Sequence, residues 1–443
     1  MSTPIADFVK NYAYDEYARF HMPGHKGNAF LGCEAFDITE VKGADALYEA
    51  DGIIAESEQN AKYLFGTGKT VYSTEGSSQC IKAMLHLSLT YKKRNGRPYV
   101  MAARNAHKAF LYAVALLDLD VVWIYPTETT SICSCPISAG QIEEELNKRD
   151  EMPIAVYLTS PDYLGGMMDI EAIADVCHKY GTLLTVDNAH GAYLHFLNKS
   201  LHPMDWGVDM CSDSAHKTLP VLTGGAYLHI GKNAPDYLRE NAKSAMALFG
   251  STSPSYLTLM SLDMCNRYLE EDYREALQAT VTNVNHVKDT LENNGWKIME
   301  SEPLKIVIKS PKVASGEGIA NMLRRKQIEC EYADKEYVVF MVTPENSYED
   351  LQNLADSLGE NHLGEPHDKL LEPVRGRQEM SVRRAMFSHQ EKIDIEDAKG
   401  RICASPTVGC PPAIPIVVSG EIITGEAIRM FQYYGIKEVF VVS

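Results

Sequence analysis

The sequence predicts an α/β fold, in which helices cover both faces of a mainly parallel β-sheet and a smaller α+β C-terminal domain follows. Short apolar runs alternate with segments of helical periodicity, and this alternation is typical of parallel strands joined by helices. The strand-like runs are 98–102, 121–125, 154–158 and 183–186, and two helical segments are 138–148 and 169–179. With 443 residues, 45% of them hydrophobic, the chain is long enough for at least two cores.

The second half of the chain predicts further domains. Residues 254–294 are charged and helically periodic, and we expect a long helix that leaves the sheet domain. The following segments predict a small α+β domain: strands 297–299, 304–308 and 337–342, and helices 316–326 and 347–358. A polar stretch, 359–368, comes next. The expected parts are an N-terminal segment 1–30, a large domain 31–290, a small domain 291–360 and a C-terminal subdomain 369–443.

The composition argues against some classes of protein. The formal net charge of −18 disfavours a nucleic-acid-binding surface and would attract cationic substrates, although acidic proteins of this kind are common. No basic and apolar leader opens the chain, and no run of 18 apolar residues occurs in it. We therefore expect a soluble, cytoplasmic protein with no nucleic-acid or membrane partner.

The ten cysteines do not indicate a metal site. They are scattered apart from the close pair Cys133 and Cys135, and they lack the paired spacing of a zinc site. His21 and His25 are separated by Pro23-Gly24, so they do not lie one turn apart on a helix. We expect no bound metal and, in a reducing compartment, mostly free thiols.

A lysine near the middle of the chain lies in surroundings that suit covalent chemistry. Lys217 follows the small polar run 212–216, and it comes thirty positions after Asp187, which follows the apolar run 183–186. Pyridoxal 5'-phosphate (PLP) needs a lysine amine to hold its aldehyde and a carboxylate to keep its ring nitrogen protonated. Asp187 and Lys217 fit these two roles, although either residue taken alone would more often be structural.

Two further segments suit a phosphate group. Residues 79–87 have helical spacing, so the run Gly76-Ser77-Ser78 should form a helix N-terminus. Backbone N–H groups and hydroxyls there can hold a phosphate against the positive end of the helix dipole, and an ordinary helix cap is the alternative. Ser214 and His216 would supply further phosphate contacts beside the lysine. Together these segments favour PLP as the cofactor.

Seven segments spread over nearly the whole chain form a recognisable set. They are Phe20-His21-Met22-Pro23-Gly24-His25-Lys26-Gly27, Ser77-Ser78, Ala103-Arg104-Asn105-Ala106-His107-Lys108, Thr159-Ser160-Pro161, Asp187-Asn188-Ala189-His190-Gly191-Ala192, Ser214-Ala215-His216-Lys217 and Ser253-Pro254-Ser255-Tyr256. In these segments the sequence resembles the PLP-dependent decarboxylases of ornithine, lysine and arginine, which share the aspartate aminotransferase fold (fold type I). The chain is similar to their short form, which lacks the extra N-terminal domain of the long, acid-induced members.

The resemblance implies roles for individual residues. Lys217 matches the Schiff-base lysine, and Asp187 matches the partner of the pyridine nitrogen. His107 matches a histidine that stacks on one face of the cofactor ring, with Ala189 on the other face. His190 lies next to the ring in this scheme, and its role stays open. The expected catalytic residues are thus Lys217, His107 and Asp187.

The resemblance also implies how the phosphate is held. The matching phosphate ligands are Ser77, Ser78, Ser214 and His216, with Gly76 beside them. Ser251-Thr252-Ser253 resembles a segment that reaches the phosphate from the neighbouring subunit, so Thr252 joins the expected cofactor-binding residues. The protein is therefore expected to be a homodimer or a larger homo-oligomer with its active site at the interface, and the large domain 31–290 is expected to bind PLP.

The chain departs from the family in its C-terminal segment. Cys410, Ala413 and Ser419 stand where the family typically has an aromatic residue, a glycine and a proline, and Asp162 stands where relatives often have threonine. The alternatives are drift in a turn and an altered substrate pocket, because side-chain specificity depends partly on this region. Glu421 is one candidate for the acidic end of a pocket for a cationic side chain.

The reaction expected from the resemblance is decarboxylation of a basic amino acid to its amine and carbon dioxide, in polyamine biosynthesis. Arginine is the first expected substrate, lysine the second and ornithine the third. Two alternatives stay open. One is another PLP-dependent reaction on the same fold, such as transamination or β-elimination, and the other is a catalytically inactive homologue that binds PLP.

Overall fold

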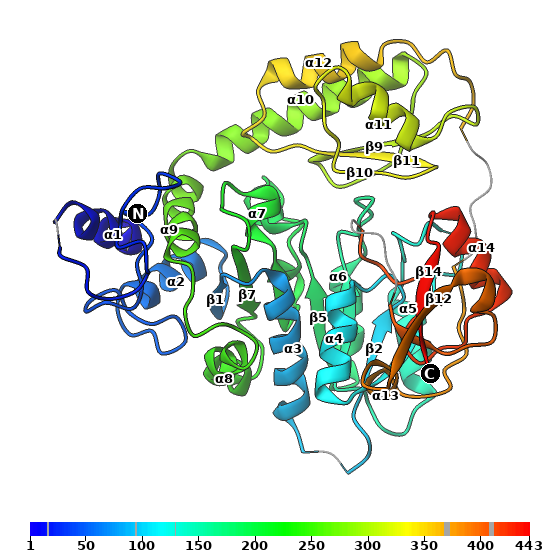
Figure 1. The fold of residues 1–443 in the computed structure, drawn as a ribbon, viewed down its shortest axis with the longest axis horizontal. Helices are drawn as coiled ribbons and strands as arrows, with labels where there is room; N and C mark the ends of the chain where they lie inside the picture. Colours follow the sequence, from blue (N-terminus) through cyan, green and yellow to red (C-terminus); the bar gives the residue numbers. More distant parts are fainter. Residues whose placement is uncertain (16, 94, 129, 367–372, 407–411) are drawn as a thin grey trace. The chain divides into compact units, whose positions relative to one another are not determined.

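The computed structural model describes residues 1–15, 17–93, 95–128, 130–366, 373–406 and 412–443 (Figure 1). The chain divides into two compact units, each made of two separate stretches. Unit 1 consists of Met1–Lys93 and Ile170–Leu277, and unit 2 consists of Arg94–Asp169 and Gln278–Ser443. The domain boundaries expected from the sequence stay predictions.

Four strands of unit 1 lie in the order β1-β7-β6-β5. They are β1 (Lys69–Ser73), β7 (Ala226–Ile230), β6 (Met210–Asp213) and β5 (Leu183–Asp187). β5 and β6 are parallel, and β7 pairs antiparallel with both β6 and β1. β1, β5 and β6 therefore run in the same direction, and their carboxyl ends lie at one edge of the sheet. Polar residues follow all three strands at this edge, which is where α/β sheets usually bind ligands.

Helices pack around these strands through their apolar sides. α3 starts shortly after β1 and packs against β5, β6, β7 and α8 (Figure 1), while α6 packs on β5 and α2 on β1. The short α7 follows β6 and carries Lys217. The helices of unit 1 are α1 (Pro4–Tyr14), α2 (Ile53–Leu64), α3 (Ser77–Tyr91), α6 (Ile170–Lys179), α7 (Ala215–Thr218), α8 (Asp236–Ala247) and α9 (Tyr256–Glu271), with 3-10 turns at Ala192–Phe196 and Pro203–Trp206.

The single helix expected over 254–294 is two helices in the structure. α9 ends at Glu271 and α10 (Tyr273–Asn293) begins two residues later. Between them, Asp272 has φ −119°, far from the usual α-helical value of about −63°. Glu270, Glu271 and Asp272 place three carboxylates at the negative end of the α9 dipole, which is unfavourable for continuing that helix.

Unit 2 contains three parallel strands in the order β4-β2-β3. They are β4 (Ala155–Thr159), β2 (Tyr99–Ala103) and β3 (Asp120–Ile124). Two helices accompany them, α4 (Lys108–Leu117) and α5 (Ala139–Asn147). The strands expected in the first half of the chain are confirmed to within one residue at each end, as are the helices expected at 138–148 and 169–179.

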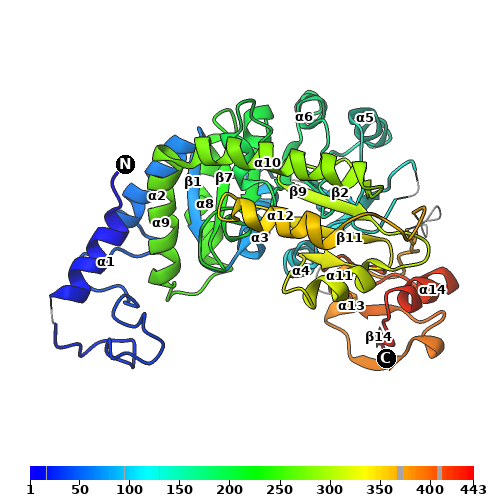
Figure 2. The same cartoon turned by 90° about the horizontal axis from the view of Figure 1, so that it is seen from above.

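Unit 2 also contains two smaller antiparallel sheets. The first has the order β10-β11-β9-β8 and shares one apolar core with α10, α11 and α12, and Figure 2 shows α12 running alongside α10. Its elements are β8 (Lys297–Ile298), β9 (Lys305–Lys309), α11 (Gly316–Arg324), β10 (Tyr332–Ala333), β11 (Tyr337–Met341) and α12 (Tyr348–Leu358). The second has the order β12-β14-β13, built from α13 (Val382–Met386), β12 (Gln390–Asp394), a 3-10 turn at Ile395–Asp397, β13 (Cys403–Ser405), α14 (Gly425–Tyr433) and β14 (Glu438–Val442). Among the described residues, no helix combines the length and apolar character that a membrane crossing requires.

Candidate active site

Lys217 and His190 meet at the carboxyl edge of the unit 1 strands. Lys217 lies in α7, just after β6, and His190 lies three residues after β5. Lys217 Nζ is 2.9 Å from His190 Nε2, and His190 is almost completely buried. The backbone N–H of Lys217 donates to Ser214 O at 3.0 Å, which closes the turn that presents the lysine. The structure thus places an imidazole, which can exchange protons, on the amine that the sequence singles out.

Asp187 supplies a buried carboxylate at the same edge. It is the last residue of β5 and only 3% of its surface is exposed. It pairs in register with Ser212 of β6, whose hydroxyl donates to Asp187 Oδ1 at 3.3 Å. A buried carboxylate needs hydrogen-bond partners of this kind. Ala189, two residues further along, is partly exposed.

The segment after β1 forms a helix start with open space beside it. Gly76 has φ +72° and precedes α3, and a Cβ built on it would meet no other described atom within 4 Å. Ser214 Oγ donates to Ser77 Oγ at 2.8 Å, and Ser77 and Ser78 are both half-buried. The hydroxyls of the two expected phosphate segments therefore lie together. The 15 residues of α3 give this end a partial positive charge.

His216 faces the loop that follows Lys217. Its Nδ1 atom lies 3.0 Å from Gly225 O, which accepts a hydrogen bond from it. Burial lowers the pKa of His216, the bond to Gly225 opposes this change, and the charge of Lys217 adds to it. A neutral imidazole with its hydrogen on Nδ1 has Nε2 as an acceptor. A phosphate contact through Nε2 would therefore require a second proton on His216, and this contact stays a prediction.

Two expected site residues, His107 and Thr252, lie at a helix cap and in an exposed turn. His107 belongs to unit 2, where it caps α4: its Nδ1 atom accepts the N–H of Ala109 at 3.1 Å. This bond makes Nε2 the nitrogen that carries the hydrogen. Thr252 belongs to unit 1 and is exposed in the turn before α9. The roles of both residues stay predictions.

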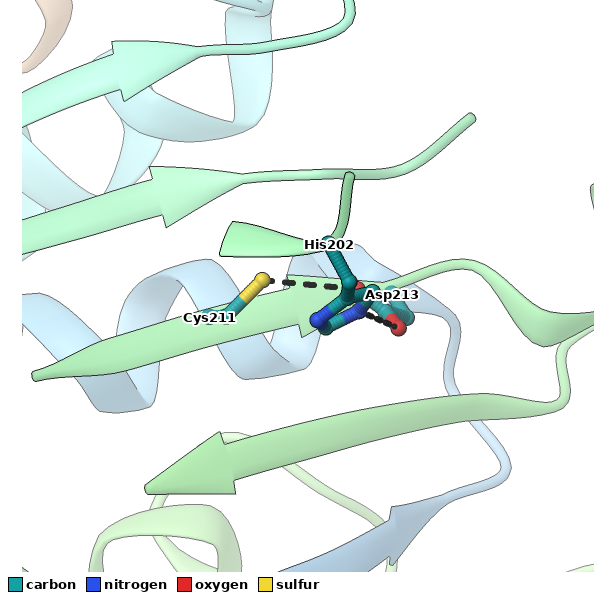
Figure 3. Close-up of side chains that lie close together, drawn as sticks. All are labelled: His202, Cys211 and Asp213. Carbon is teal, nitrogen blue, oxygen red and sulfur yellow. Dashed lines mark hydrogen bonds and ion pairs between the residues drawn. The ribbon is translucent and has the colours of Figure 1, made fainter. Parts of the chain in front are cut away.

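Sequence reasoning missed a buried network that begins at the end of β6. Asp213 is completely buried; its Oδ1 atom accepts from Asn188 Nδ2 and its Oδ2 atom accepts from His202 Nε2, both at 2.8 Å (Figure 3 draws the His202 bond). His229 Nε2 lies 3.2 Å from Asp213 Oδ2. Burial acts to raise the pKa of Asp213, but the two histidines outweigh it and hold this pKa well below its usual value. No short-range spacing could have indicated the network, because its members come from separate segments.

Asp162, one of the departures from the family pattern, has structural partners within unit 2. Its Oδ1 atom accepts the N–H groups of Leu164 at 2.9 Å and Gly166 at 2.8 Å, which closes the turn after β4. The hydroxyl of Ser134 donates to Asp162 Oδ2 at 2.5 Å. Burial raises the pKa of Asp162, and these hydrogen bonds oppose the change. These contacts favour a structural role for Asp162.

The departures in the C-terminal segment differ from one another. Ala413 has φ +57°, a conformation that glycine adopts more readily, so the chain keeps a glycine-like turn there without the glycine. Ser419 is completely buried. Glu421 is buried with its Oε2 atom 3.7 Å from Arg104 Nη2, so it already has a cationic neighbour. Cys410 lies outside the described residues.

Comparisons with known proteins extend over nearly the whole chain. The family model "Orn/Lys/Arg decarboxylase, major domain" matches residues 3–357, and "Orn/Lys/Arg decarboxylase, C-terminal domain" matches residues 366–441. The uncharacterized protein YaaO of Bacillus subtilis is 28% identical, with 97% of this chain and 93% of that protein covered. An arginine decarboxylase of Bacillus subtilis is 27% identical, with 96% and 92% covered.

A solved structure shows the same fold. The lysine decarboxylase LdcF of Francisella novicida superposes with a TM-score of 0.83 at 15% identity, over 100% of this chain and 81% of that chain. The α/β fold class expected from the sequence and the resemblance carried by its seven segments are both confirmed.

Proposed function

Because the chain belongs to the Orn/Lys/Arg decarboxylase family, we propose that it removes carbon dioxide from a basic amino acid with the help of PLP. The observation that carries the proposal is the 2.9 Å contact between Lys217 Nζ and His190 Nε2. His190 follows the buried carboxylate of Asp187 by three residues. Arginine is the first proposed substrate because the arginine decarboxylase of Bacillus subtilis aligns over 96% of the chain. Lysine is the second proposed substrate and ornithine the third. We propose that the reaction serves polyamine biosynthesis.

The residues of unit 1 fit PLP. The open space beside Gly76 and the adjoining hydroxyls of Ser77 and Ser214 form a cradle of hydrogen-bond donors at a positive helix end, which suits a phosphate. Lys217 offers a primary amine for an aldehyde, and Asp187 offers a buried carboxylate for a protonated ring nitrogen. We assign these residues as the cofactor site, with Ser78, His216 and Ala189 as further contacts.

The mechanism follows from what these side chains can do. PLP, when bound, supplies a conjugated ring that takes up the electron pair left behind when carbon dioxide departs. Asp187 would hold a proton at the ring nitrogen, because a buried carboxylate favours a positively charged partner. His190 Nε2 can take a proton from Lys217 Nζ or return it over 2.9 Å. A protonated Lys217 Nζ could deliver a proton to the substrate carbon, and His190 could restore that proton to the amine.

The proposal extends to a cytoplasmic homodimer or larger homo-oligomer with the active site at the subunit interface. Thr252 is exposed in the turn before α9, so it is accessible to the phosphate site of a second subunit. His107 caps α4 through Nδ1, and we propose that the ring of His107 stacks on the cofactor. A single substitution of Thr252 would then weaken cofactor binding only in the assembled protein.

An absorbance spectrum followed by product assays tests the proposed function. A visible absorbance band is expected for PLP bound to a lysine, and it should be present in the wild type and lost in Lys217→Ala. Lys232→Ala, an exposed lysine of the same unit, is the matched control and should keep the band. Carbon dioxide release from arginine, lysine and ornithine then identifies the substrate.

Each outcome of this experiment separates the alternatives. A wild type without the band would refute the cofactor assignment. A band with a keto acid product, and no carbon dioxide, would indicate another PLP-dependent reaction. A band with no product from any of the three substrates would indicate an inactive homologue.

A further inference from the structure

Asp213 lies in a fully buried polar cluster of unit 1 (Figure 3). Its Oδ2 atom accepts from His202 Nε2 at 2.8 Å, and His229 Nε2 is 3.2 Å from the same oxygen. Its Oδ1 atom accepts from Asn188 Nδ2 at 2.8 Å and from the Cys211 thiol at 3.4 Å. None of these five side chains is exposed. The carboxylate thus accepts hydrogen bonds from three side chains and has the imidazole of His229 as a fourth neighbour.

The cluster has residue types that could bind a metal, but its hydrogen bonds hold the Asp213 carboxylate in place. We refer to Asp213 and its four neighbours as the anchor. The ligand atoms of His202, Cys211 and Asp213 lie within 4.8 Å of one another. However, His202 Nδ1 accepts the backbone N–H of Met204 at 3.2 Å, so Nε2 carries the hydrogen that is donated to Asp213 and offers no lone pair to a metal. Burial and the neighbouring Asp213 raise the pKa of Cys211 well above its usual value, which keeps it a thiol. The donors therefore fix the carboxylate in place.

Asn188 connects this anchor to the candidate active site. It lies between Asp187, at the end of β5, and His190, which contacts the lysine. Its carbonyl accepts the N–H of Gly191 at 2.8 Å, while its side chain is held by Asp213. A Cβ built on Gly191 would lie 1.9 Å from Asn188 Oδ1, so the amide is packed directly against this glycine. The side chain of Asn188 is therefore held between Gly191 on one side and the carboxylate of Asp213 on the other.

We infer that Asp213 is a positioning residue, whose carboxylate holds Asn188 and thereby fixes the turn 187–191 at the cofactor site. The turn carries both the carboxylate and the imidazole that the proposed chemistry needs, and such groups work only within a narrow range of positions. Asp213 acts through Asn188 and is not itself a catalytic residue. The inference rests on the proposed function, because its readout is the binding of PLP.

A double-mutant cycle tests the inference. The dissociation constant for PLP and the position of the absorbance band are measured for the wild type, Asp213→Asn, Asn188→Ala and the double variant, each shown to be folded by circular dichroism. Asp213→Asn should weaken PLP binding about tenfold or more, as expected for loss of a hydrogen bond to a charged group, and it should shift the band. In the Asn188→Ala background the same change should alter binding by less than about twofold, because the connection is already broken.

Asp205 provides a matched control in the same unit. Its Oδ2 atom pairs with His195 Nδ1 at 2.7 Å, so Asp205→Asn also breaks an aspartate–histidine pair, but at a partly exposed position. This variant should keep the dissociation constant and the band of the wild type. A merely structural role of Asp213 would lower the unfolding temperature and leave both quantities unchanged in the folded protein. If Asp213→Asn does not fold, His202→Phe, which removes a donor from the Asp213 carboxylate, takes its place in the cycle with the same expected outcome.

The outcomes distinguish this inference from the proposed function. A wild type that binds no PLP refutes the proposed function, and the inference falls with it. The inference alone is overturned if the wild type binds PLP and the variants bind it equally well. It is also overturned if the effects of the two substitutions are additive in the cycle. Weaker binding that disappears in the Asn188→Ala background supports it.

Discussion

Substitution of Arg104 should destabilise unit 2 strongly, because this arginine holds the C-terminal segment by several buried contacts. Its Nη1 and Nη2 atoms donate to the carbonyls of Pro415 and Ile416, both at 2.9 Å. Nη2 also lies 3.7 Å from Glu421 Oε2, and the guanidinium carbon lies 5.3 Å from the centre of the Trp123 ring. Arg104 and Glu421 are 6% and 1% exposed, so water cannot replace either partner.

The magnitude follows from these contacts. Arg104→Met keeps the length of the side chain but leaves Glu421 as an uncompensated buried charge, which typically costs about 3–5 kcal/mol. The carbonyls of Pro415 and Ile416 also lose their donor, and each unsatisfied carbonyl typically costs about 1–3 kcal/mol. Part of this cost is already contained in the ~3–5 kcal/mol for the buried charge. Glu421→Gln should cost less, about 1–2 kcal/mol, because the amide oxygen can still accept the N–H of Val418 and Arg104 keeps its two carbonyls.

The assay is denaturant unfolding followed by tryptophan fluorescence, which is sensitive to the packing around Trp123. Arg97→Met is the matched control, since Arg97 pairs with Asp118 and Asp120 on the surface and is 48% exposed. Exposed pairs contribute about 0–1 kcal/mol, so this variant should resemble the wild type. If Arg104→Met costs no more than Arg97→Met, the reasoning about the buried ion pair is wrong.

Three further predictions concern unit 1. Burial raises the pKa of the Asp263 carboxyl from its ordinary 3.8 to about 6. The free energy of unfolding should therefore be highest below pH 3.8 and fall by about 3 kcal/mol as the pH rises through 6. Asp263→Asn should abolish this loss in denaturant unfolding from about pH 4 to 7, and an unchanged pH dependence would contradict the assignment. The hydrogen bond that His178 donates to the Asp209 carboxylate raises the pKa of His178 above 6.5, so the contribution of His178 to stability is complete below pH 6.5 and is lost as pH rises through the raised pKa. The wild type should therefore exceed His178→Gln in stability by more at about pH 5 than at about pH 9, and equal differences would count against it. Gly191→Ala places a Cβ 1.9 Å from Asn188 Oδ1, and overpacking of this kind typically costs about 1–3 kcal/mol. The melting temperature measured by circular dichroism should therefore fall by several degrees. An unchanged melting temperature would show that the turn can shift to accept the methyl group.

Much of the sheet could be predicted because its signals are local. The runs that became β5 and β2 are short, apolar and bounded by polar residues, so each is recognisable without knowledge of the rest of the chain. Asp187 could be placed at a strand end for the same reason. The antiparallel direction of β7 could not be predicted, because it depends on how the chain returns after α7 and not on the residues of the strand.

The residues of the candidate site could be proposed from the sequence only where it has a continuous motif. Ser214 and Lys217 lie in one short segment, and the structure places Lys217 on His190 and Ser214 on Ser77. The anchor at Asp213 was missed because its partners His202 and His229 reach it from a connecting turn and from the neighbouring strand. The pairing of β6 with β7 brings His229 beside Asp213, whereas His202 comes from the start of the 3-10 turn Pro203–Trp206.

The pairing of β1 with β7 has a consequence for synthesis of the protein. Lys69 of β1 pairs with Ile230 of β7, so β1 has no partner strand in unit 1 until about 160 more residues have been made. At ~5–20 residues per second this interval lasts roughly 8–30 s on the ribosome. Contacts of such long range also slow folding after release. Throughout this time the unpaired backbone of β1 can bind other chains, so the nascent protein should depend on chaperones until β7 has emerged.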